Sequence, residues 1–175
     1  MPNWCYNELR ITGDEEKLIE LQNLVQGKNG CLDFDKVIPY PDEYRKQDEY
    51  CAKLPPEERY KVKDGYNSGG YDWCIATWGT KWNACEPSYN TDGETIMYSF
   101  DTAWSPPEPI VEKLSEMFPT LHFELRFEEG GMGFSGYSIY EKGIQIEYAT
   151  GSYNAFPLTE HECFDEDEEE TPETG

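Results

Sequence analysis

The fold of this chain is decided by residues 95–127, TIMYSFDTAWSPPEPIVEKLSEMFPTLHFELRF, which predict a strand, a helix and a second strand in succession. Apolar and polar residues alternate over residues 95–100 and again over residues 121–127, the period that sends successive side chains to opposite faces of a sheet. Between these segments the apolar residues recur with the helical period; they are Ile110, Val111, Leu114, Met117 and Phe118. Pro119 ends the helix. The segment is therefore predicted to form one β-α-β unit.

The start of this helix has two candidate positions. Ser105 and Glu108 have the spacing of a capping box, in which each side chain binds a free backbone N–H at the start of the helix. With that start, however, Pro109 would be the fourth helical residue, where it lacks the N–H that the helix needs. A start near Pro109 avoids this loss, and the sequence leaves both positions open.

The N-terminal part of the chain predicts a second unit of the same kind. Residues 4–12 alternate as a strand, with Cys5, Asn7, Leu9 and Ile11 on one face. A helix with an apolar stripe follows, beginning at Asp14 and ending at Gly27, and residues 32–38 predict another strand. Two β-α-β units predict an α+β fold of the ferredoxin-like kind, a split β-α-β sandwich with both helices on one face of an antiparallel sheet.

Three further segments lie outside this predicted core. Residues 42–70 hold seven acidic and six basic residues and predict an inserted, mostly helical and exposed excursion. Residues 137–140 and 144–148 predict an added C-terminal β-hairpin. Residues 159–175 have too few apolar groups to fold alone and predict an acidic disordered tail. The expected organisation is one domain, residues 1–158, followed by the tail.

The negative charge is the strongest global property of the chain. Asp and Glu number 36 against 14 Lys and Arg, which gives a net charge of −22. Nine of these acids lie in residues 160–175, where Lys and Arg are absent, but the rest of the chain is acidic as well. Such a field repels phosphate backbones and attracts basic surfaces, so a protein partner is expected rather than nucleic acid. The alternative is that the charge only maintains solubility.

The cysteines and the N-terminus favour a reduced, cytoplasmic protein. No apolar run reaches the 18 residues of a membrane span, and the start lacks the basic and apolar regions of a signal peptide. The six cysteines show no C-x-x-C spacing, and the histidines are only His122 and His161. We therefore expect free thiols, no metal site and no cofactor.

Two tryptophan-rich motifs are too polar for a core segment and too aromatic for an ordinary loop. They are residues 78–82, WGTKW, and residues 100–107, FDTAWSPP. Only the short excursion of residues 83–94 separates the first motif from the strand that holds the second, so we expect the motifs to form one cluster at a sheet edge. The candidate site residues within them are Trp78, Lys81, Trp82, Asp101 and Trp104.

Three interpretations of this cluster remain open. The tryptophans could pack over the sheet as a structural cluster, with Lys81 and Asp101 as a local ion pair. They could instead form a protein-binding surface. Lys81 and Asp101 could also act as an acid–base pair in a catalytic site, although catalysis needs a tuned base or nucleophile and the sequence supplies few candidates.

The two motifs, together with the opening MPNWCYN of residues 1–7, resemble the YubB-type ferredoxin-like domain proteins of phages and plasmids. The resemblance covers roughly residues 1–140; the insertion at 42–70 and the acidic tail are less similar to the family. It implies a ferredoxin-like domain encoded by a mobile element. It implies no catalytic residues.

These features together predict a non-enzymatic phage or mobile-element protein that binds a host protein with a basic surface. In its most concrete form, the protein is an anti-defence inhibitor whose carboxylates imitate nucleic acid and occupy the nucleic-acid-binding surface of a defence protein. Further candidate partner-binding residues are then those of the tail, Glu166, Asp167, Glu168 and Glu169. The alternative is an enzyme that acts on a small molecule or nucleotide through the region of residues 78–104. Oligomeric state is left open.

Overall fold

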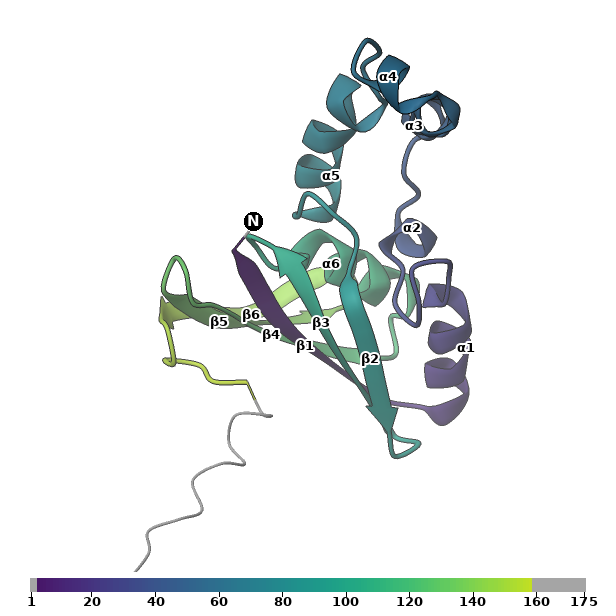
Figure 1. Ribbon diagram of the computed structural model, residues 1–175. Helices are drawn as coiled ribbons and strands as arrows, with labels where there is room; N and C mark the ends of the chain where they lie inside the picture. The colour runs from purple at the N-terminus through teal and green to yellow at the C-terminus, as the bar shows by residue number, and fades with distance from the viewer. Residues whose placement is uncertain (1–2, 159–175) are drawn as a thin grey trace, which may run out of the picture.

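The computed structural model describes residues 3–158, in which one antiparallel sheet of six strands forms the base of the fold (Figure 1). In chain order the strands are β1 (Trp4–Thr12), β2 (Cys85–Thr91), β3 (Thr95–Ala103), β4 (His122–Glu129), β5 (Phe134–Glu141) and β6 (Ile144–Ser152). Across the sheet the order is β2-β3-β1-β4-β5-β6, and all neighbours are antiparallel. The predicted ferredoxin-like α+β fold is therefore present, because β2-β3-β1-β4 is the split β-α-β sheet.

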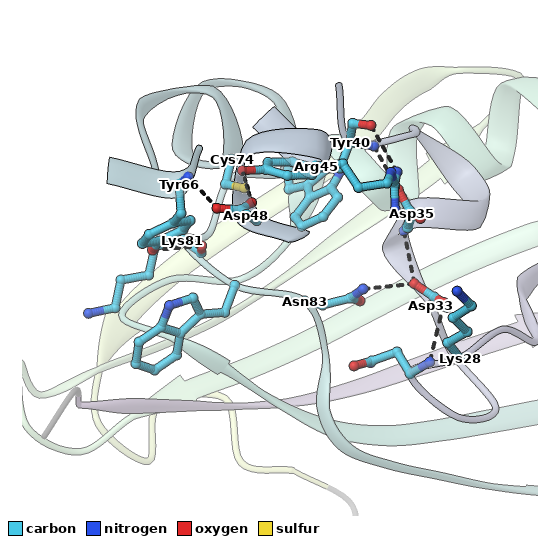
Figure 2. A pocket seen from close by; sticks show the side chains of 13 residues that line it. Lys28, Asp33, Asp35, Tyr40, Arg45, Asp48, Tyr66, Cys74, Lys81 and Asn83 are labelled. Atoms are coloured by element: carbon cyan, nitrogen blue, oxygen red, sulfur yellow. Dashed lines mark hydrogen bonds and ion pairs between the residues drawn. The ribbon is translucent and has the colours of Figure 1, made fainter. Parts of the chain in front are cut away.

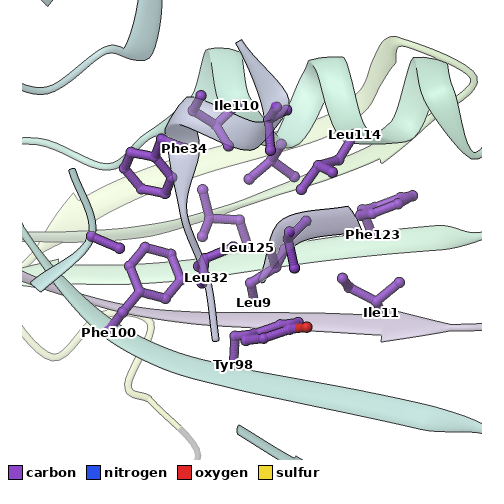
Figure 3. Close-up of a cluster of buried hydrophobic side chains, with 14 of the residues drawn as sticks. Leu9, Ile11, Leu32, Phe34, Tyr98, Phe100, Ile110, Leu114, Phe123 and Leu125 are labelled. Carbon is purple, nitrogen blue, oxygen red and sulfur yellow. The ribbon is translucent and has the colours of Figure 1, made fainter. Parts of the chain in front are cut away.

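Three helices cover one face of this sheet (Figure 1): α1 (Glu15–Val25), α2 (Phe34–Val37) and α6 (Glu108–Met117). The core between the two layers is built from alternate residues of the central strands (Figure 3), as the period of two predicts. The large side chains that are buried there include Leu9, Ile11, Phe34, Ile96, Tyr98, Phe100, Ile110, Leu114, Phe123 and Leu125.

Residues 32–38 form no strand, so the expectation of one is wrong. They contain the short helix α2, which Asp33 caps: its side chain accepts a hydrogen bond from the backbone N–H of Asp35 at 3.1 Å. Phe34 and Val37 point from this helix into the core. A short apolar run gives the same sequence signal for a buried strand and a buried helix, and here the capping aspartate favours the helix.

The strand that completes the split sheet is β2. It lies within residues 83–94, which were expected to be a short excursion without a strand. β2 is an edge strand and is exposed along most of its length. Its pairing with β3 is irregular between Cys85 and Ser88, around Pro87. Edge strands tolerate such bulges and prolines. β2 also buries neither face, so no apolar residues mark it. The sequence of β2 therefore carries no alternation from which to predict it.

The helix α6 begins at Glu108, so the capping-box start is wrong. The hydroxyl of Ser105 does not cap the helix; it donates a hydrogen bond to the carbonyl oxygen of Gly79 at 2.6 Å. Pro109 is the second helical residue, where a missing N–H costs nothing because the first N–H groups of a helix have no partner within it. The start near Pro109 is thus the closer of the two alternatives.

Between α2 and β2 the chain leaves the sandwich and forms a group of helices beside one end of the sheet (Figure 1). In order they are α3 (Asp42–Lys53), α4 (Pro56–Arg59), one wide turn η1 (Tyr66–Gly70) and α5 (Tyr71–Trp78). Helical structure thus continues beyond residue 70, the expected end of the insertion. As a result, the first tryptophan motif begins on a helix and not in a loop.

The sheet face opposite the helices carries no helix within residues 3–158, but residues 153–158 cover part of it at β5, where Phe156 packs against Tyr137 (Figure 1). The side chains of this face are largely polar: Arg126 pairs with Glu124 at 2.7 Å on β4. Asp101 on β3 lies next to Tyr6 on β1. This face offers neither the row of aromatic rings nor the basic surround with which ferredoxin-like sheets stack RNA bases.

Candidate functional site: an aromatic patch and an adjoining cleft

The two tryptophan motifs meet where the end of α5 reaches the end of β3. The hydroxyl of Thr80 donates a hydrogen bond to the carbonyl oxygen of Ala103 at 3.0 Å, and Ser105 donates to Gly79 at 2.6 Å. Thr102 in turn donates to the carbonyl oxygen of Ser105 at 2.7 Å. The hydroxyls of Thr80 and Ser105 therefore join one motif to the other, and Thr102 holds the second motif in place.

The strand β1 takes part in this network through Asn7, which is 2% exposed. Its side-chain amide donates to the hydroxyl of Thr102 at 2.9 Å and to the carbonyl oxygen of Cys5 at 2.8 Å. A buried amide without such partners would be costly. The opening of the chain and the second tryptophan motif are thus fixed to each other from within the core.

Gly79 ends α5 in a left-handed conformation, with φ of 79°. A Cβ atom at this position would also lie 2.8 Å from Cδ of Pro109. Both the backbone angle and the close approach require glycine. This residue therefore sets the direction in which the chain leaves α5 toward the second half of the motif.

The side chain of Lys81 lies between two tryptophan rings. Its Nζ is 4.4 Å from the ring centroid of Trp82 and 5.7 Å from that of Trp104. The ring of Trp4 joins the group, with its centroid 6.1 Å from that of Trp82. The ammonium is thus held by the electron-rich faces of aromatic rings, a cation–π arrangement.

The expected ion pair between Lys81 and Asp101 is wrong, since no such contact occurs in the part of the chain that the structure describes. Asp101 instead faces the side of the sheet that carries no helix, opposite Cys85 on β2. Burial raises the pKa of its carboxyl, and the nearby carboxylate of Glu86 raises that pKa further. Lys81 and Asp101 therefore do not form the pair that an acid–base site would need.

The structure divides the tryptophans of the motifs between core and surface. Trp78 is buried, at 5% exposure, and its Nε1 donates to the carbonyl oxygen of Ile38 at 2.9 Å. Trp82 and Trp104 are 37% and 45% exposed. Trp104 also has a φ of 74°, which for a residue other than glycine costs about 1–3 kcal/mol. The fold thus holds a large aromatic ring at the surface in an unfavourable backbone conformation.

Two residues of α5 extend this exposed surface. Tyr71 and Ile75 are 41% and 43% exposed and line, with Lys81 and Trp104, a shallow hollow of about 270 Å³. We call the whole surface the aromatic patch; it consists of Trp4, Tyr71, Ile75, Lys81, Trp82 and Trp104. The candidate residues of the tail, Glu166, Asp167, Glu168 and Glu169, lie outside the described residues.

A cleft of about 420 Å³ adjoins the aromatic patch and shares Lys81 and Trp82 with it. Figure 2 shows that side chains from both the inserted helices and the ferredoxin-like core surround it. From the insertion, Arg45 makes two hydrogen bonds with the carboxylate of Asp35, at 2.8 and 3.0 Å. The two bonds form a bidentate pair that fixes α3 against the core.

The side of the cleft formed by the core depends on Asp33, which is 4% exposed. Its carboxylate accepts hydrogen bonds from the side-chain amide of Asn83 at 2.7 Å and from the backbone N–H of Asn29 at 3.3 Å. Asn83 also accepts from the backbone N–H of Phe34 at 2.9 Å. These bonds connect the chain that follows the first tryptophan motif to the start of α2.

Two acid–base groups in the cleft, Cys74 and Tyr40, have raised pKa values. Burial raises the pKa of the Cys74 thiol to about 11, with a further contribution from Asp48. Burial and then Asp48 also raise the pKa of the Tyr40 phenol, which donates a hydrogen bond to that carboxylate at 3.2 Å. Both groups are therefore protonated at neutral pH, and neither is an activated nucleophile or base.

Sequence reasoning missed the polar residues of the cleft. Asp33, Arg45, Asp48 and Asn83 come from three separate segments and belong to no recognisable spacing. One signal was available: Asp33 directly precedes an apolar run, which is the position of a residue that caps the start of a helix.

Other site chemistry is not assembled in the described chain. Cys5, Cys31, Cys51, Cys74 and Cys85 are free thiols there, and Cys163 lies outside it. Residues 3–158 contain no group of His, Cys, Asp or Glu that could hold a metal ion. None of their helices is long and apolar enough to cross a membrane.

Residues 77–174 match the family model described as the ferredoxin-like domain in Api92-like protein. The chain belongs to the Api92-like family. Its fold is similar to the crystal structure of a protein api92 from Yersinia pseudotuberculosis, with a TM-score of 0.58 and 13% identity over 90% of this chain and 100% of that chain. At this identity the likeness shows the fold alone. No curated protein matches the chain.

The matched segment divides the site of this Api92-like chain. Trp82 and Trp104 of the aromatic patch lie within residues 77–174, whereas Arg45 and Asp48 of the cleft precede them. The matched segment thus holds three of the six residues of the patch, Lys81, Trp82 and Trp104, while the cleft also depends on α3.

Proposed function

We propose that this protein is not an enzyme and acts by binding another protein through the aromatic patch. The observation that carries the proposal is the exposure of Trp82 and Trp104, at 37% and 45%, on loops fixed by the hydrogen bonds of Thr80 and Ser105. Rigid exposed aromatic rings are the side chains that contribute most to protein interfaces. Their position is fixed before binding, so little ordering entropy is lost on association.

The charge of the chain defines the chemistry of the partner. With a net charge of −22, the protein attracts a basic surface over a distance and repels an acidic one. Asp101 in the second motif and the nearby Glu86 add carboxylates. The partner is therefore a protein with a basic surface that also offers apolar contacts to the tryptophans.

A more specific form of the proposal is an anti-defence protein of a phage or plasmid, acting in the host cytoplasm. In this form the carboxylates, including Glu166, Asp167, Glu168 and Glu169, occupy the nucleic-acid-binding surface of a host defence protein. Its support is the acidic composition and the resemblance of the motifs to YubB-type proteins. An enzyme based on Lys81 and Asp101 has less support, because these side chains are not paired.

Capture of partners from a host lysate tests the proposal when matched variants are compared. We expect wild-type protein to retain a partner that Trp104→Ala and Trp82→Ala lose. Ile19→Ala is the control, because Ile19 is 49% exposed on α1, outside the patch. The wild-type complex should weaken as salt rises from about 50 to 500 mM, since screening shortens the reach of the charges. A partner retained equally by both tryptophan variants would refute the role of the patch.

A further inference from the structure

The cleft between the inserted helices and the core has the size of a small-molecule site. Its volume of about 420 Å³ falls within the range of roughly 300–1,000 Å³ that such sites occupy. It forms at the junction of two parts of the fold, where ligand sites commonly lie. The proposed protein-binding function uses the neighbouring patch and leaves the interior of the cleft without a role.

Most polar groups of the cleft are already satisfied by one another. Arg45 is paired with Asp35, and the hydroxyl of Tyr40 donates to Asp48. Two lysines of the lining differ, because within residues 3–158 neither ammonium has a hydrogen bond or ion pair: Lys81 lies over tryptophan rings, and Lys28 is exposed at the edge of the cleft. Figure 2 places Lys28 on the core side of the cleft, next to Asp33 and away from Lys81. An unpaired cation at the edge of a cleft favours an anionic group there.

The remaining lining favours a planar ring. Trp82 contributes a ring that is 37% exposed; Tyr40 and the buried Trp78 also line the cleft, with ring centroids 6.1 Å apart. Planar ligands gain stacking and edge contacts on such walls beyond the burial of their area. The amide of Asn83 uses one N–H for Asp33 and has a second N–H to offer a ligand.

We infer that the cleft binds a small planar aromatic molecule that carries an anionic group, of the class of the nucleoside monophosphates. The ring lies against the aromatic wall that includes Trp82, and the anionic group pairs with Lys28. This inference is independent of the proposed partner, although Trp82 contributes to both surfaces.

Calorimetric titration of the full chain tests the site with four probes: adenosine 5′-monophosphate, uridine 5′-monophosphate, adenosine and inorganic phosphate. We expect both nucleotides to bind saturably, and adenosine and phosphate to bind at least about tenfold more weakly, because each lacks one of the two contacts. Lys28→Gln should weaken nucleotide binding about tenfold and leave adenosine unaffected. Lys63→Gln, which changes an exposed lysine of the insertion outside the cleft, should have no effect.

Variants of Trp82 test the aromatic half of the site. Trp82→Ala should weaken both nucleotide and adenosine binding, and Trp82→Phe should restore most of it because a ring is retained. Equal thermal midpoints of the variants exclude loss of folding. Absence of saturable nucleotide binding, an unchanged affinity in Lys28→Gln, or phosphate binding as tight as nucleotide binding would each overturn the inference. Trp104→Ala separates the two proposals: it should abolish partner capture and leave nucleotide binding intact.

Discussion

At the scale of single residues, the same amino acid has opposite roles within one five-residue motif. Trp78 is buried and hydrogen-bonded to Ile38, whereas Trp82 is exposed and stacks on Lys81. The sequence identifies the motif but does not show which tryptophan is buried, because the residue type is the same at the core and at the surface. The division depends on where α5 ends, and that is fixed by the left-handed Gly79.

We predict that this division appears directly in stability. Trp78→Ala should lower the free energy of unfolding by about 3–5 kcal/mol, because it leaves a cavity in the core. Trp104→Ala should cost about 1 kcal/mol or less, as an exposed side chain is removed. Chemical denaturation measures both values. Trp104→Gly is the control for the backbone, since it relieves the positive φ and should be no less stable than Trp104→Ala. Equal losses at Trp78 and Trp104 would contradict the division.

Asp101 gives a prediction for the pH dependence of stability. Its pKa is raised in the folded state by burial and by Glu86, so the folded protein binds a proton more tightly than the unfolded chain does. Stability from this group is therefore lost as pH rises from the unfolded pKa, about 3.9, through the raised value. Asp101→Asn should increase the free energy of unfolding at neutral pH, and the increase should vanish below that window.

Asp35 is the matched control for this measurement. Hydrogen bonding to Arg45 lowers its pKa, so its contribution is present above the unfolded pKa and is lost as pH falls. Asp35→Asn should therefore reduce stability at neutral pH, the opposite sign to Asp101→Asn. Denaturation series at several pH values distinguish the two. A stability loss in Asp101→Asn at neutral pH would show that its charge is favourably placed.

At the scale of helices and strands, the elements that the sequence predicts correctly are those that bury one face in the core. β1, β3, β4 and α6 each bury one face in the core, so their sequences carry the period of the structure. β2 is an exposed edge strand, held by its pairing with β3, and no local pattern records such pairing. α2 is one helical turn, too short for a period of 3.6 residues to differ from alternation.

The candidate site was predictable to the extent that it was local. Both tryptophan motifs stand out because rare residues gather in short segments, and the structure joins them through Thr80 and Ser105. The cleft was not predictable, because Asp33, Arg45 and Asp48 are ordinary polar residues that only the packing of the insertion brings together. The Lys81–Asp101 pair failed because closeness in sequence does not fix the face of the sheet on which a side chain lies.

At the scale of the whole molecule, the described fold is closed by residues near position 158. Phe156 packs against Tyr137 with ring centroids 5.4 Å apart, and Leu158 is 5% exposed. These contacts connect the last described residues to β5. The nine acidic residues that follow lie outside the described residues and contribute −9 of the net charge of −22.

We predict that deletion of residues 159–175 leaves the thermal midpoint within a few degrees of the wild type. The deleted segment holds nine acids and almost no apolar residues, and a change of about 1 kcal/mol moves the midpoint of a domain of this size by roughly 2–4 °C. Differential scanning calorimetry measures the shift. Deletion of residues 153–175 is the control, because it also removes Phe156 and Leu158 and should lower the midpoint further. A collapse with the shorter deletion would show that the acids are structurally paired.

The central position of β1 has a consequence for how the protein is made. Trp4 pairs with Ala103 on one side, and Cys5 pairs with Glu129 on the other. Translation adds about 5–20 residues per second, so β1 leaves the ribosome roughly 5–20 seconds before either neighbour exists. During that interval both edges of the strand are open to chaperones or to the wrong neighbours. The central strand of the sheet is thus synthesised before both of the strands with which it pairs.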